Sequence, residues 1–158
     1  MKTVIYYYSY TQKTKLAAEA LGKVCGAELR EIQETKKRNK LNAYFGGCRA
    51  ALRHQASSIK PVDVNLKNCD PIFIGSPIWA GNAAPALNAL LAQINLKDKN
   101  VILFFTMRGG GGKNAIQYLT ELITAQGGKV IDSVIFRSMV KTEELTKQAE
   151  DFGKKYKK

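Results

Sequence analysis

The sequence predicts an α/β protein built on a doubly wound, five-stranded parallel sheet. Two observations lead to this prediction. Strand-like and helix-like segments alternate along the chain, and most of the strand-like segments are almost entirely apolar. Strands of that composition are typical of a parallel sheet covered on both faces, and right-handed crossovers place the connecting helices on its two sides. The length of 158 residues suits a single domain, 1–158.

Five segments have the pattern of strands. They are residues 3–8, 28–32, 71–75, 101–106 and 130–136. Short apolar runs that end at turn residues favour buried strands. The segment 28–32 mixes charged and apolar residues, so we expect it to be half exposed.

Five helices are expected between and after these strands. They are residues 14–24, 42–55, 85–94, 114–126 and 142–156. In the first helix, apolar side chains recur at the spacing of one helix face; they are Ala17, Ala20, Leu21 and Val24. The second helix has a similar stripe, formed by Leu41, Tyr44, Phe45, Cys48 and Leu52. This stripe either covers the sheet or docks a partner.

The charge of the chain is strongly positive, with a net charge of +12 and a pI near 9.7. Between residues 36 and 60 there are seven cations and no acid, and the tail 154–158 reads KKYKK. Clusters of this kind attract anionic partners and resemble a nucleic-acid footprint. The alternative is a solvated basic surface that keeps the protein in solution.

Several protein classes are excluded by composition. No apolar run reaches the length of a membrane helix, and the N-terminal segment reads as a first strand rather than a signal peptide. We therefore expect a cytoplasmic protein. Cys25, Cys48 and Cys69 are widely spaced and His54 is the single histidine, a pattern that favours neither a disulfide framework nor a metal site.

Loop one, residues 9–14, reads SYTQKT and lies between the first strand and the first helix. In a doubly wound sheet, ligands bind outside the carboxyl ends of the strands. Backbone N–H groups at a helix N-terminus favour an anion, and we expect the hydroxyls of Ser9, Thr11 and Thr14 to point outward beside them. The loop therefore predicts a phosphate-sized site, although it lacks the Rossmann and P-loop patterns. The alternative is a plain helix cap, which needs one hydroxyl.

Loops two and three follow the third and fourth predicted strands. Loop two, residues 75–85, reads GSPIWAGNAAP and holds Trp79, the one tryptophan of the chain. An indole in a tight turn at a strand end offers a stacking surface for a flat ring; the alternative is a core side chain. Loop three, residues 106–114, reads TMRGGGGKN. Its four glycines indicate a backbone that a ligand approaches closely; the alternative is a flexible surface loop.

An anion grip, an aromatic surface and a glycine wall together suit a mononucleotide with a flat ring. In these three loops the chain resembles the flavodoxin-like FMN-binding proteins, and the resemblance extends over nearly its whole length. It implies a three-layer sandwich with strand order 2-1-3-4-5 and a non-covalently bound FMN. The FMN-binding residues it implies are Ser9, Tyr10, Thr11, Gln12, Lys13, Thr14, Ser76, Pro77, Ile78, Trp79, Ala80, Gly81, Thr106, Met107, Arg108, Gly109, Gly110 and Gly111.

The sequence departs from the flavodoxin pattern at three points. Gln12 and Lys13 stand where the family usually has Gly and Asn. Loop three has Met107 and Arg108 where an aromatic residue often covers the flavin, which leaves one flavin face open. Lys13, Arg108 and Lys113 add positive charge where flavodoxins are usually acidic, so we expect a raised two-electron potential.

The predicted function is electron transfer through the bound FMN. No His, Asp or Glu lies in the three loops, so no catalytic residue is nominated and the cofactor carries the chemistry. The expected partner is a redox protein, of acidic character given the basic surface, and the protein is expected to be a monomer or a dimer. Two alternatives stay open: a small FMN-dependent quinone or nitro reductase that uses NAD(P)H, and a non-redox module that binds anions or nucleic acid. Neither a membrane nor nucleic acid is the expected partner.

Overall fold

A five-stranded parallel sheet forms the centre of the molecule. The computed structural model describes residues 1–157, apart from the side chains of Ala43 and Tyr44. The sheet order is β2-β1-β3-β5-β6, and all four neighbouring pairs are parallel. The five strands are β1 (Lys2–Tyr8), β2 (Glu28–Ile32), β3 (Cys69–Trp79), β5 (Asn100–Met107) and β6 (Lys129–Arg137). The predicted fold class and strand order are confirmed.

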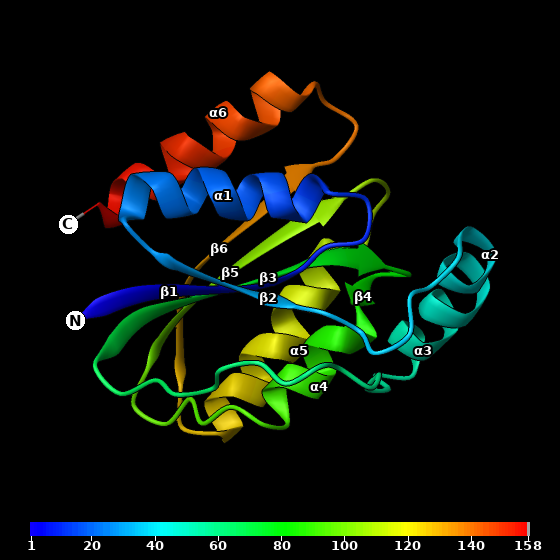
Figure 1. Cartoon of the computed structure of the whole chain (residues 1–158), viewed down its shortest axis with the longest axis horizontal. Coiled ribbons are helices and arrows are strands. Elements are labelled where there is room, and N and C mark those ends of the chain that lie inside the picture. The colour runs from blue at the N-terminus through cyan, green and yellow to red at the C-terminus, as the bar shows by residue number, and fades with distance from the viewer. Residues whose placement is uncertain (158) are drawn as a thin grey trace.

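Helices cover both faces of this sheet and complete three layers. The first face carries α1 (Lys13–Cys25) and α6 (Thr142–Gly153), and the second carries α4 (Pro85–Leu91) and α5 (Gly112–Ala125) (Figure 1). The carboxyl ends of the parallel strands point toward one end of the sheet. At that end lies a separate helical segment, made of α2 (Lys40–Asn42), a π-helix at Ala43–Gly47 and α3 (Cys48–Leu52). None of the helices in residues 1–157 is long and apolar enough to cross a bilayer.

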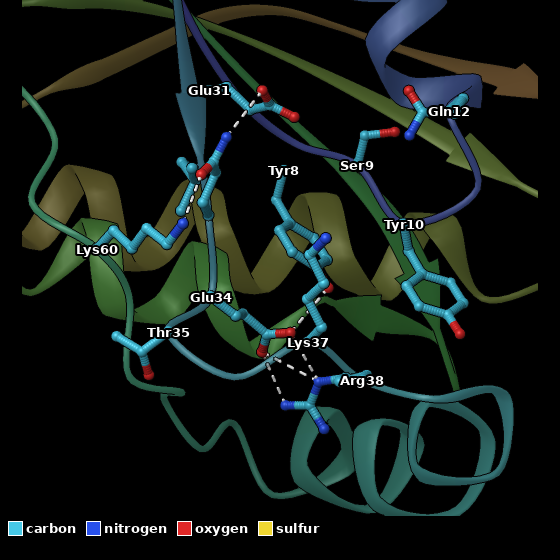
Figure 2. A pocket seen from close by; sticks show the side chains of 12 residues that line it. Tyr8, Ser9, Tyr10, Gln12, Glu31, Glu34, Thr35, Lys37, Arg38 and Lys60 are labelled. Atoms are coloured by element: carbon cyan, nitrogen blue, oxygen red, sulfur yellow. Dashed lines mark hydrogen bonds and ion pairs between the residues drawn. The ribbon is translucent and has the colours of Figure 1, made fainter.

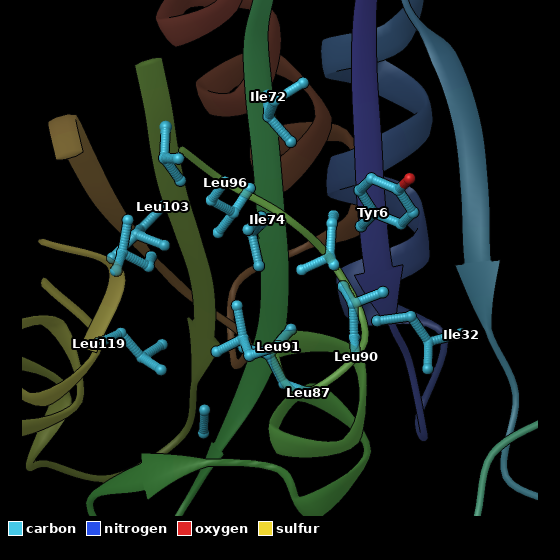
Figure 3. Close-up of a cluster of buried hydrophobic side chains, with 14 of the residues drawn as sticks. Tyr6, Ile32, Ile72, Ile74, Leu87, Leu90, Leu91, Leu96, Leu103 and Leu119 are labelled. Atoms are coloured by element: carbon cyan, nitrogen blue, oxygen red, sulfur yellow. The ribbon is translucent and has the colours of Figure 1, made fainter. Parts of the chain in front are cut away.

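The alternation of side chains along β1 explains why both faces need a cover. Ile5 and Tyr7 belong to the core under α1 and α6, whereas Val4 and Tyr6 belong to the core over α4 and α5. Neighbouring residues of a strand point to opposite faces, so an apolar strand fills two cores. Figure 3 shows the second core, in which side chains of the central strands meet those of α4 and α5.

Several segments differ from the expected secondary structure, and α4 ends at Leu91 rather than at residue 94. Residues 76–79, predicted as loop, extend β3, and Trp79 pairs with Asn82 of a short antiparallel strand, β4 (Asn82–Ala83). Pro77 is tolerated because β1 pairs with β3 only as far as Gly75, so the missing N–H breaks no bond on that side. The predicted helix 42–55 is an unbroken helical stretch over residues 40–52 whose middle, Ala43–Gly47, is π-helical, and it does not cover the sheet.

The C-terminal helix is shorter than predicted. α6 ends at Gly153, and a 3₁₀ turn, Lys154–Tyr156, follows it. Lys158, the last residue of the KKYKK tail, lies outside the described residues, as does the side chain of Tyr44 in the predicted stripe.

Candidate functional site

Loop one turns the chain from β1 into α1 through an unusual backbone conformation. Gln12 is the residue before the helix and has a φ of 69°, in the left-handed region. Glycine adopts this conformation at little cost, whereas a residue with a Cβ does not. The carbonyl of Gln12 accepts the N–H of Leu16 at 2.9 Å, which starts the helix. The loop therefore has the shape that a glycine would favour, with a glutamine in its place.

The hydroxyls of loop one have separate tasks. Ser9 Oγ accepts the N–H of Lys15 at 3.2 Å and so caps the first turn of α1. Thr14 is 1% exposed, and its Oγ1 lies 2.7 Å from Oγ1 of Thr106. The prediction that Thr14 points outward is wrong, because the first turn of the helix packs against the end of β5. Thr11 is exposed beside the start of the helix.

The positive charge of Lys13 is directed toward another loop. Its Nζ donates to the carbonyl of Val140 at 3.4 Å. Val140 lies in the connection between β6 and α6, a segment that the three predicted loops do not include. Lys13 thus joins loop one to this fourth connection and stays at the N-terminal end of α1.

Loop two is held by a buried serine. Ser76 is fully buried, and its Oγ accepts the N–H of Ala84 at 2.9 Å. This bond spans the hairpin between β3 and β4. At its tip, Ala80 and Gly81 both have positive φ, 49° and 78°, so the peptide between them is presented in a strained conformation at Ala80.

Trp79 is packed on its surroundings rather than freely presented. The rings of Tyr8 and Tyr10 meet it edge-on, each with centroids 5.9 Å away. The guanidinium of Arg38 lies over the indole at 5.8 Å. A Cβ on Gly47 would come within 2.7 Å of the indole, so only glycine allows this approach. The indole side chain is half-buried, and its predicted stacking on a flavin stays a prediction.

Loop three meets loop two through glycine backbones. A Cβ on Gly111 would lie 2.5 Å from the Cα of Gly81, and Gly111 has a φ of 89°. By contrast, a Cβ on Gly109 or Gly110 would meet no described atom within 4 Å. Arg137, at the end of β6, donates to the carbonyl of Gly109 at 2.6 Å. The glycine run is therefore held at both ends, by Arg137 at the Gly109 carbonyl and by Gly81 at Gly111, and is open between them.

The remaining predicted residues of loop three differ in exposure. Thr106 and Met107 are buried at the end of β5, whereas Arg108 is exposed. The structure thus brings the ends of all three loops together through two contacts, Thr14 with Thr106 and Gly81 with Gly111.

A comparison with known families agrees with this arrangement. The family model described as Flavodoxin matches residues 2–150. The chain belongs to the flavodoxin family. No curated protein matches it.

Solved structures resemble this flavodoxin-family chain over most of its length. A flavoprotein of Lactobacillus acidophilus, crystallised in complex with FMN, is 30% identical with a TM-score of 0.72; the match covers 85% of this chain and 92% of that one. A protein of Bacteroides uniformis is 23% identical with a TM-score of 0.77, over 93% and 96%. Oxidised flavodoxin 2 of Bacillus cereus is 16% identical with a TM-score of 0.61, over 97% and 95%, and shows the fold alone.

The residues at these loops fit the cofactor of the family. The N-terminus of α1 and the Thr11 hydroxyl suit a phosphate. The backbone of loop three at Gly109 and Gly110 is open to close approach by a ligand, since no described atom lies within 4 Å of a Cβ placed there. The exposed Arg108 and Lys113 add positive charge beside it.

A cleft of about 610 Å³ lies between the ends of β1 and β2, and Ser9, Tyr10 and Gln12 of loop one form part of its lining (Figure 2). Its lining is mixed in charge. It consists of Tyr8, Ser9, Tyr10, Gln12, Glu31, Ile32, Gln33, Glu34, Thr35, Lys37, Arg38 and Lys60. Glu34 is the centre of its polar contacts: it accepts the hydroxyl of Tyr8 at 2.9 Å and pairs with Arg38 at 2.9 Å. Burial, and next the charge of Glu34, raise the pKa of the Tyr8 hydroxyl.

Sequence reasoning missed three residues that shape this region. Glu34 and Arg38 hold the chain after β2 against Trp79, and Arg137 fixes loop three. Arg38 was visible only as one of seven cations, and no local pattern separates it from the rest. Arg137 had no signal, because its contact depends on the neighbouring positions of β5 and β6.

Proposed function

We propose that this flavodoxin-family chain binds one FMN non-covalently at loops one, two and three and transfers electrons through it. The observation that supports this most directly is the meeting of the three loops at the carboxyl ends of β1, β3 and β5. The 30% identical flavoprotein of Lactobacillus acidophilus, which was crystallised with FMN, adds independent support.

Each loop has a role in this proposal. The N-terminus of α1 and the Thr11 hydroxyl bind the phosphate. The peptide between Ala80 and Gly81 and the backbone of Gly109–Gly111 contact the ring. The bound flavin supplies reversible storage of electrons. Ser9 and Thr14 position loop one. Ser9 accepts a backbone N–H in the first turn of α1, and Thr14 is hydrogen-bonded to Thr106.

The charges at the site favour the reduced cofactor. Reduction adds negative charge at the ring, and cations nearby stabilise that charge. Arg108 and Lys113 are exposed in loop three and at the start of α5, and Arg137 bonds the loop from β6. This arrangement supports a two-electron potential above that of acidic flavodoxins.

The experiment is a fluorescence titration of FMN with the purified, flavin-free protein. We expect saturable quenching at one FMN per chain and yellow protein after gel filtration. Thr11→Val should weaken FMN binding. Thr142, at the start of α6, is also an exposed threonine, and Thr142→Val should leave FMN binding unchanged. Protein that takes up no FMN overturns the proposal.

A second candidate function is supported by the open side of loop three. Loop three carries no aromatic residue, and the outer sides of Gly109 and Gly110 face no described atom within 4 Å. A hydride donor or quinone would have access to a flavin ring held there, as in a small reductase. Steady oxidation of NAD(P)H by the FMN-loaded protein and a quinone alone identifies a reductase; its absence identifies a carrier. A cytoplasmic location and a monomeric or dimeric state stay predictions.

A further inference from the structure

The segment Lys40–Leu52 has its apolar side chains on the unexpected face. Leu41 is 68% exposed, Phe45 67% and Leu52 60%. Gly47 and Ala51, in contrast, are buried. A helix on a globular protein normally turns its large apolar residues inward. Here the small residues face the protein and the large apolar residues face solvent.

Close packing against Trp79 explains why the side chains on the inner face of the segment are small. Gly47 lies against the indole of Trp79, where a Cβ would come within 2.7 Å. Ala51 follows four positions later, which places it on the same helix face. Leu41, Phe45 and Leu52 are spaced by four and seven residues, so they form one stripe on the opposite face. We call this stripe, with Lys40, Arg49 and Arg53 around it, the α2–α3 face.

The segment that carries the α2–α3 face has positively charged side chains and no acidic ones. Lys40, Arg49 and Arg53 are exposed on the segment, and no acid occurs between Glu34 and Asp63 in the sequence. The nearest carboxylate on the connection, Glu34, is already paired with Arg38 at 2.9 Å. Exposed apolar side chains within a polar rim mark interaction sites, and this rim selects an anionic partner.

The position of the α2–α3 face points to a protein partner. Its inner side touches Trp79 through Gly47, and Arg38 lies over the same indole at 5.8 Å. Trp79 belongs to loop two, so one helix, about 10 Å across with its side chains, separates a molecule on this face from the proposed flavin loops. We infer that the α2–α3 face docks an acidic redox protein that exchanges electrons with this chain. This inference rests on the proposed function for the role of the partner, while the docking itself does not.

The test measures binding of a small acidic iron–sulfur protein of the ferredoxin type to the FMN-loaded full chain. Titration calorimetry at about 0.05 M salt, where surface charges are weakly screened, gives the dissociation constant. Two variants remove different parts of the face: Arg49→Glu with Arg53→Glu, and Leu41→Gln with Leu52→Gln. We expect each pair to weaken binding by about tenfold or more. Amide NMR shifts upon binding should concentrate in residues 40–53.

Matched controls change the same chemistry elsewhere. Lys129→Glu with Lys147→Glu reverses two exposed cations on β6 and α6, and Ile131→Gln removes an apolar side chain that is 43% exposed on β6. These should change the dissociation constant less than about twofold. Equal losses in the control and the α2–α3 variants would mean that net charge alone attracts the probe, and would overturn the inference.

Other outcomes identify other occupants. If the variants leave ferredoxin binding unchanged but abolish binding to phosphatidylserine vesicles, the face binds membranes and the inference is wrong. If light scattering shows a dimer that Leu41→Gln with Leu52→Gln dissociates, the occupant is a second copy and the inference is again wrong. FMN titration of every variant separates the two proposals. Variants that bind FMN normally but no longer bind the ferredoxin support docking at the α2–α3 face. If the wild-type chain takes up no FMN but still binds the ferredoxin at this face, the docking stands and only the redox role is rejected.

Discussion

The side-chain hydroxyls of Thr14 and Thr106 lie 2.7 Å apart in the interior, and both residues are almost completely buried. Thr14 is in the first turn of α1 and Thr106 is near the end of β5. The contact therefore ties loop one to loop three, at the point where the proposed phosphate and ring sites have to keep a fixed separation. Its energetic value is measurable.

Thr14→Val and Thr106→Val should each destabilise the protein by about 1–2 kcal/mol, because each leaves the other hydroxyl buried without its partner. The double variant should cost clearly less than the sum, since both polar groups are then gone. Urea denaturation of the four proteins checks this. Strictly additive losses would show that the two hydroxyls do not interact.

Gln12→Gly should stabilise the protein, by about 0.5–1 kcal/mol. The φ of 69° at Gln12 costs a residue with a Cβ about 1–2 kcal/mol, and the added freedom of glycine in the unfolded chain offsets part of the gain. Gln12→Ala is the control, because it removes the side chain and keeps the strain. Thermal unfolding that ranks alanine level with glycine contradicts the strain argument.

Gly111→Ala should weaken FMN binding by about tenfold or more, which corresponds to about 1.4 kcal/mol. The new Cβ would meet the Cα of Gly81 at 2.5 Å and would carry the unfavourable φ of 89°, so loops two and three have to separate. Gly110→Ala is the matched control, because a Cβ there meets no described atom within 4 Å. Equal FMN affinities for the two variants, by fluorescence titration, would show that the glycine contact does not shape the site.

Much of the fold was readable because its strands are apolar on both faces. The run 101–106 fills two cores at once, so neither its strand state nor its parallel pairing needed tertiary information. The order of the loops follows from that topology. This explains why the sequence could place the three loops at one end of the sheet but could not give their individual contacts.

The errors occurred where distant residues decide the structure. Gly75, Pro77 and Gly81 read as turn residues, yet pairing with β5 and β4 extends the strand to Trp79. Likewise, a helical stripe in 42–55 says that one face is apolar but does not say which way it points. The approach of Gly47 to Trp79 decides that, across 32 positions of sequence.

Tyr156→Phe should make the protein less stable at neutral pH, by about 1–2 kcal/mol. The Tyr156 hydroxyl donates to Asp132 Oδ2 at 2.6 Å. Burial alone would raise the pKa of Asp132, but hydrogen bonds from Tyr156, the Ser133 N–H and Lys155 together lower it. Because the pKa of Asp132 is lower in the folded protein, this carboxylate stabilises the fold at pH values above about 3.8, its pKa in the unfolded chain. The contribution is lost as the pH falls through the folded pKa. The variant and wild type should thus converge in urea denaturation near pH 2–3; an equal difference at both pH values would assign the loss to packing.

Arg108→Gln with Lys113→Gln should lower the two-electron potential of the bound flavin. Both cations are exposed next to the glycine run, and their attraction for the charge added on reduction is screened by solvent. A decrease of about 10–20 mV is therefore expected, and it should shrink as salt is added. Lys129→Gln, at the amino-terminal end of β6 and far from the loops, is the control and should leave the potential unchanged. A potentiometric titration in which all three proteins agree would mean that Arg108 and Lys113 do not set the potential.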